Sequence, residues 1–134
     1  IWRFDAEPDR PARPVEIARV SDAGPLVDDI EGMTLYYTAD GGGYLIASSQ
    51  GSDEYVVYSR EETPEYIGRF AIVSSETIDE GLFVAQDGRN TLPDANQNFK
   101  LVPWGEIARQ LGLTIDTTWD PRAVGAPEAS APGG

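Results

Sequence analysis

The chain has 134 residues, with 23 Asp or Glu against 10 Lys or Arg, so its formal net charge at pH 7 is −13. A surface this acidic repels nucleic acid and anionic membranes, and no apolar run approaches the roughly 18 residues that span a bilayer. Cysteine and histidine are both absent, which excludes disulfides, thiolate chemistry, histidine zinc sites and triads built on imidazole.

The length suits one domain, and the 14 Gly and 10 Pro separate short apolar segments, as is typical of an antiparallel β protein. Residues 1–4 fit the end of a strand, and residues 9–14 fit an irregular loop. Four strands are then predicted in close succession, at 33–38, 44–49, 54–59 and 66–73. The Asp40-Gly-Gly-Gly sequence predicts the hairpin turn between the first two. Together the four strands have the size of one blade of a β-propeller.

Two further strands are predicted at 81–85 and 98–102, followed by one helix at 103–111. In the helix, Ile107 and Leu111 lie four residues apart, and Gly112 would end it. The last residues, 123–134, have no apolar periodicity and are predicted to be a disordered tail.

Oxygen-bearing side chains gather directly after the strand at 81–85. Gln86, Asp87 and Asn90 follow it, which is a plausible arrangement for a hard cation such as Ca²⁺. The same residue types also form ordinary turns, so both interpretations remain open on the residues alone. A second acidic element lies upstream at 28–32, where a strand is about to begin.

Five segments, taken together, resemble the C-terminal third of a β-propeller phytase in the same order along the chain: 1–8, 29–37, 43–51, 81–88 and 95–104. The resemblance implies an all-β domain over residues 1–122, with a complete four-stranded blade at about 28–73 and a partial blade at about 74–104. Both would belong to a six-bladed ring, closed here by a short helix. It also implies a secreted or periplasmic protein. Because the chain starts at Ile1 without a leader, we expect a mature product or a fragment.

The resemblance also assigns roles to individual residues. Asp29 and Glu31 are similar to an acidic pair that holds active-site Ca²⁺ and orients the attacking water, and Gln50 to a residue lining the substrate site. The remaining metal ligands implied by the resemblance are Asp79, Asp87 and Asn90. Asp29 and Glu31 are two residues apart at a strand entrance, so both carboxylates would project from one face.

Two functions from different classes follow. In the first, the chain is a fragment of a Ca²⁺-dependent enzyme of the 3-phytase type, a phosphoric monoester hydrolase that acts on phytate by metal-assisted attack of water. Its partner would be the rest of the propeller, on another chain or in further sequence. In the second, the chain is a non-catalytic Ca²⁺-binding segment or scaffold derived from a phytase. The short 73–80 segment and Arg89, at a usually acidic position, favour the second for the isolated chain.

Overall fold

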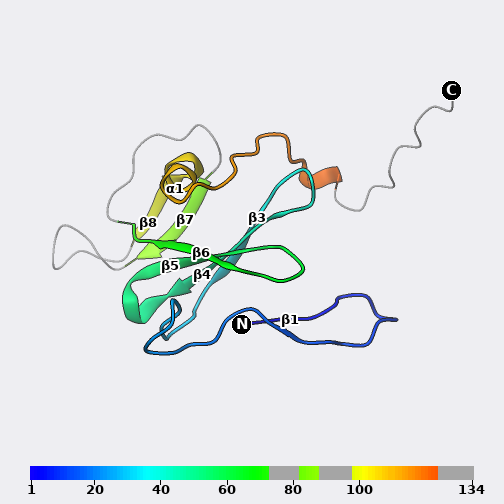
Figure 1. The fold of residues 1–134 in the computed structure, drawn as a ribbon. Helices are drawn as coiled ribbons and strands as arrows, with labels where there is room; N and C mark the ends of the chain where they lie inside the picture. Colours follow the sequence, from blue (N-terminus) through cyan, green and yellow to red (C-terminus); the bar gives the residue numbers. More distant parts are fainter. Residues whose placement is uncertain (73–81, 88–97, 124–134) are drawn as a thin grey trace, which may run out of the picture.

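The computed structural model describes residues 1–72, 82–87 and 98–123, drawn in colour in Figure 1. The strands are β1 (Trp2–Arg3), β2 (Val15–Glu16), β3 (Met33–Tyr37), β4 (Gly43–Ser49), β5 (Glu54–Ser59), β6 (Tyr66–Phe70), β7 (Leu82–Asp87) and β8 (Asn98–Pro103). The helices are α1 (Trp104–Leu111) and two short 3₁₀ turns, η1 (Gln50–Ser52) and η2 (Pro121–Ala123). Strands therefore dominate the described part of the chain, as the sequence predicts.

Strands β3 to β6 form one antiparallel sheet in sequence order. Each strand lies within a few residues of its predicted position, and β6 ends at Phe70 rather than at residue 73. The register places Leu35 opposite Leu45, and a shift after Val57 marks a bulge between β5 and β6. Alternation along these strands sends successive side chains to opposite faces, so the sheet has two apolar faces that need cover.

The N-terminal segment covers one face of this sheet. Its core contains Leu26 together with Leu45, Ala47, Val56 and Tyr58 from β4 and β5. Ile1, Ile17, Ala18 and Ile30 pack against this cluster. The N-terminal ammonium donates to the Ala18 carbonyl at 2.7 Å, and the Ile17 amide donates to the Ile1 carbonyl at 3.0 Å. These bonds hold the start of the chain against the segment that follows β2, and the apolar packing attaches both to the sheet.

Helix α1 and the residues after it cover the other face. Ile46, Val57 and Phe70 of the sheet pack with Val102, Trp104, Ile107 and Ala108. The Trp104 ring stacks on Tyr36 with centroids 4.2 Å apart, and its indole N–H donates to the Thr114 carbonyl at 3.0 Å. The helix ends at Gly112, whose φ of 67° is the left-handed conformation that glycine adopts most easily. The predicted helix and its stop are thus confirmed.

Strands β7 and β8 form a separate antiparallel pair, with Leu82 opposite Pro103 and Asp87 opposite Asn98. Helix α1 follows β8 directly and contacts both β8 and β6, so it links this pair to the four-stranded sheet (Figure 1). The fold class is all-β, with antiparallel sheets of the kind that form propeller blades. The described residues form no closed ring.

Two of the tryptophans differ in burial. Trp104 is 2% exposed, whereas Trp2 is 51% exposed in this chain. Among the described residues, the two-residue strand that carries Trp2 pairs only with β2. Within the described ranges, no helix is long and apolar enough to cross a membrane. The predicted tail at 123–134 lies almost entirely outside the described residues, as does the domain boundary that depends on it.

Candidate functional site

The segment 27–32 runs beside the end of β4 and the turn η1. The Gln50 amide donates to the Asp29 carbonyl at 3.0 Å, and the Gly51 amide donates to the Asp28 carbonyl. Asp29 and Gln50 are 21 residues apart in sequence, yet the structure makes their backbones direct partners. Two of the predicted site residues are therefore brought together, and Glu31 follows on the same segment.

Two adjacent serines at the end of β4 hold this segment in place. The Ser48 hydroxyl accepts hydrogen bonds from the amides of Glu31 and Gly32, each at 2.9 Å, while the Ser48 amide donates to the Gly32 carbonyl at 2.9 Å. The Ser49 hydroxyl accepts from the Val27 amide at 2.9 Å and contacts the Val27 carbonyl at 3.1 Å. The backbone around the acidic pair is thus fixed at both ends by side chains of one strand.

Sequence reasoning missed both serines. The only available signal is their position, since a Ser-Ser pair directly precedes the turn that carries Gln50. Serine at a strand end is common. The segment that these serines bind comes beside them only through the pairing of β3 with β4, which the sequence does not display.

The carboxylates of this segment are uncommitted. Asp28, Asp29 and Glu31 are all exposed, and within residues 1–72 their carboxylate oxygens enter no hydrogen bond or ion pair. Asp40 shows the contrast, because its carboxylate binds the Thr38 hydroxyl at 2.5 Å and the Gly42 amide at 3.0 Å. The Thr38 hydrogen bond, followed by that of Gly42, lowers the pKa of Asp40. Asp40 is used to close a turn, whereas the acids at 28–31 remain available to a ligand.

The type of donor fits Ca²⁺, which prefers carboxylate, carbonyl and amide oxygens and takes six to eight of them. The number of donors does not complete a site, because the described residues contain no group of three or more acidic side chains that could hold a metal ion. Asp29, Glu31 and Gln50 can therefore supply only part of a coordination shell, with the remainder coming from water or from other parts of the protein.

The other predicted ligands are largely outside the described residues. Asp79 and Asn90 both fall there. Asp87 is the last residue of β7 and pairs with Asn98 across the two-stranded sheet. The metal-binding roles of these three residues stay predictions.

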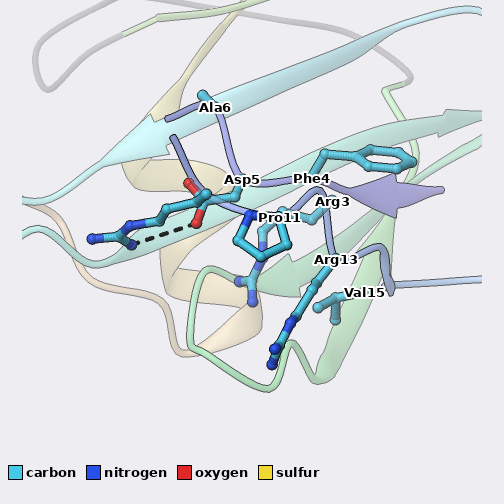
Figure 2. Close-up of a pocket in the computed structure, with 8 residues that line it drawn as sticks. Arg3, Phe4, Asp5, Ala6, Pro11, Arg13 and Val15 are labelled. Atoms are coloured by element: carbon cyan, nitrogen blue, oxygen red, sulfur yellow. Dashed lines mark hydrogen bonds and ion pairs between the residues drawn. The ribbon is translucent and has the colours of Figure 1, made fainter. Parts of the chain in front are cut away.

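A cavity of about 530 Å³ lies elsewhere, in the N-terminal loop (Figure 2). Its lining residues are Arg3, Phe4, Asp5, Ala6, Arg10, Pro11, Arg13 and Val15, so it contains none of the predicted site residues. Arg3 donates to the carbonyls of Glu61 and Glu62, in the loop that joins β5 to β6. That loop and η1 lie at opposite ends of β5, so the cavity and the acidic segment are at opposite ends of the sheet.

The charged side chains that line this cavity are three arginines and one acid, Asp5. Asp5 forms an ion pair with Arg10 at 3.4 Å, drawn as the dashed line in Figure 2. Arg3 is held by the backbone carbonyls of Glu61 and Glu62, so two of the three arginines already have partners.

Fold and site together define a β-sheet protein, built from antiparallel blade-like sheets, with an exposed oxygen-donor segment at one strand end. Comparison with known proteins gives the particular family. The family model described as Phytase matches residues 1–81 and 79–126, and the chain belongs to this family. The resemblance seen in the sequence is thus confirmed.

One curated relative is the 3-phytase of Bacillus subtilis (strain 168). It is 39% identical to this chain over 138 residues, which cover 87% of the chain and 36% of the relative. The chain therefore spans about a third of the length of the curated relative that it matches.

Proposed function

We propose that this chain is part of a Ca²⁺-dependent phytase that hydrolyses phosphomonoester bonds of phytate. The observation that carries the proposal is the pair of uncommitted carboxylates, Asp29 and Glu31, on a segment whose backbone is fixed by β4. Membership of the phytase family and the 3-phytase name of the Bacillus subtilis relative support this substrate. On this proposal the parent protein is a secreted or periplasmic enzyme of the 3-phytase type.

Each residue of the site has a distinct task in the proposed reaction. Asp29 and Glu31 would hold Ca²⁺ with their carboxylates and hydrogen-bond the attacking water, and the Gln50 side-chain amide would contact substrate from the adjacent turn. When bound, Ca²⁺ would offset the repulsion between a phosphate and a chain of net charge −13 and would make the attacking water more acidic. Water is the nucleophile, so the chain needs no histidine or cysteine for this chemistry.

The rest of the site would come from the part of the protein that this chain lacks. The described residues do not complete a metal site, and the chain has about a third of the length of its relative. Basic residues for the substrate phosphates and further acidic ligands are accordingly expected outside this sequence. The remainder of the propeller is the partner that the proposal requires.

The test is release of phosphate from phytate by a form of the protein extended to the full length of its curated relative. Activity should require Ca²⁺ and disappear with a chelator. Asp29→Asn combined with Glu31→Gln should lower activity about a hundredfold or more, since several kcal/mol of charge stabilisation would be lost at about 1.4 kcal/mol per factor of ten. The matched control is Glu61→Gln with Glu62→Gln, which removes the same charge from the exposed β5–β6 loop.

The outcomes separate the two functions that the sequence left open. Normal turnover by the Asp29 and Glu31 double variant would show that these residues do not have the proposed roles. Calcium binding without any phosphate release from phytate would instead favour a non-catalytic Ca²⁺-binding protein derived from a phytase.

A further inference from the structure

We infer that Ser48 is a positioning residue for Glu31: its hydroxyl fixes the direction in which the Glu31 carboxylate leaves the backbone and so raises the affinity of the site for Ca²⁺. This inference rests on the proposed function, because it takes Glu31 to be a calcium ligand. It concerns a side chain that would not touch the ion or the substrate.

The geometry of the contact is specific. A serine oxygen has two lone pairs, and Ser48 uses both, one for the Glu31 amide and one for the Gly32 amide, each at 2.9 Å. The Ser48 amide also donates to the Gly32 carbonyl at 2.9 Å. Three hydrogen bonds from one residue thus fix the backbone from the Glu31 amide to the Gly32 carbonyl, while Glu31 itself stays exposed.

Burial distinguishes this role from ordinary structural support. Glu31 and Gly32 are both exposed, so water could satisfy their amides if the hydroxyl were removed. Ser49 differs, because it is fully buried, and its loss would leave the Val27 amide without an acceptor. What the Ser48 hydroxyl adds is therefore a fixed direction. A ligand held in its binding geometry loses less conformational freedom when the ion binds.

The experiment is calorimetric titration with CaCl₂ of the same full-length form used for the phytate assay. Ser48→Ala should weaken calcium binding by about tenfold or more, the effect typical of residues that orient metal ligands. Ser48→Thr keeps the hydroxyl and should restore affinity. Ser59→Ala is the matched control, since the Ser59 hydroxyl also accepts a backbone amide, from Glu65 at 2.9 Å, but at the opposite end of β5. It should leave calcium affinity unchanged.

Hydrogen exchange gives a second readout that needs no metal. In the wild-type protein the amides of Glu31 and Gly32 should exchange slowly for exposed residues. In Ser48→Ala both amides should exchange faster, while the amides within β4 keep their wild-type exchange rates. Fast exchange at both amides in the wild type, or wild-type calcium affinity in Ser48→Ala, would overturn the inference.

The calcium proposal itself fails in a different way. If the wild-type protein takes up no calcium, the proposed function is wrong and the inference falls with it. If the wild type binds calcium and Ser48→Ala binds it with the same affinity, the proposed function survives and the positioning role alone is wrong.

Discussion

At the scale of single residues, this chain uses its acids in two ways. Asp116 is a structural acid: its carboxylate accepts the Ala39 amide at 2.6 Å and both the amide and the hydroxyl of Thr118 at 2.7 Å. Asp29 and Glu31 have no such partners within residues 1–72. A carboxylate that already accepts several local hydrogen bonds has fewer lone pairs left for an ion, so hydrogen bonding separates the two classes where charge alone does not.

The pH dependence of stability should report on Asp116. The Ala39 amide, followed by Thr118, lowers the pKa of this carboxyl from 3.8 to about 2. A lowered pKa in the folded state means that the stabilisation is complete above about pH 4 and is lost as the pH falls toward 2. Asp116→Asn should therefore lower the free energy of unfolding at pH 7, and the difference from wild type should shrink at pH 3.

Urea unfolding at the two pH values, with a chelator present, measures this difference. Asp22→Asn is the control, since Asp22 is exposed and has no partner in the described ranges. A difference between Asp116→Asn and wild type that stays constant from pH 7 to pH 3 would contradict the assignment.

At the scale of elements, the sequence predicts strands and helix well because their signals are local. Aromatic and β-branched residues recur through β3 to β6, and turns that contain Gly or Pro separate the strands, so β4 was expected at 44–49 and spans Gly43–Ser49. The short strand β2 (Val15–Glu16) was not predicted, because a two-residue strand has no periodicity and forms only by pairing with β1.

The candidate site was only partly predictable from the sequence, because some of its contacts join residues that are far apart along the chain. Asp29, Glu31 and Gln50 stand out as oxygen donors near strand ends, and the structure does place them on neighbouring segments. The contacts of Ser48 and Ser49 join residues 16 to 22 positions apart, so they depend on the fold and leave no local pattern.

The close packing of the turn η1 predicts the effect of a substitution at Gly51. Its Gly51 lies so close to the segment 27–28 that an added Cβ would meet the Asp28 carbonyl oxygen and approach Val27 Cγ1 to 3.0 Å. Gly51→Ala should therefore lower the free energy of unfolding by about 1–3 kcal/mol, the usual cost of overpacking. It should also weaken calcium binding, because it displaces the backbone that carries Asp29.

Gly32→Ala is the matched control, because a Cβ at Gly32 would meet nothing within 4 Å. Urea unfolding and calcium titration of both variants check the prediction. Equal stability of the two variants would show that the close approach of η1 to the acidic segment does not exist in solution.

At the scale of the whole molecule, one edge of the four-stranded sheet carries exposed apolar side chains and has no pairing partner among the described residues. Strand β3 is the first strand of that sheet and pairs only with β4 within it. Met33 and Leu35 are 59% and 41% exposed, and they share one face because they are two residues apart. An exposed edge strand with apolar side chains favours pairing with another chain.

We therefore expect the isolated chain to self-associate unless the rest of its propeller is present. Its net charge of −13 opposes association, so the effect should grow with salt as repulsion is screened. Sedimentation should give a mass above 14.6 kDa that increases with ionic strength. Leu35→Lys should move the mass toward that of a monomer, whereas Ile115→Lys, which alters a residue 37% exposed outside the sheet, should not. A compact monomer that unfolds cooperatively at high salt would mean that β3 needs no partner, and the chain would then be a complete folding unit without the other blades.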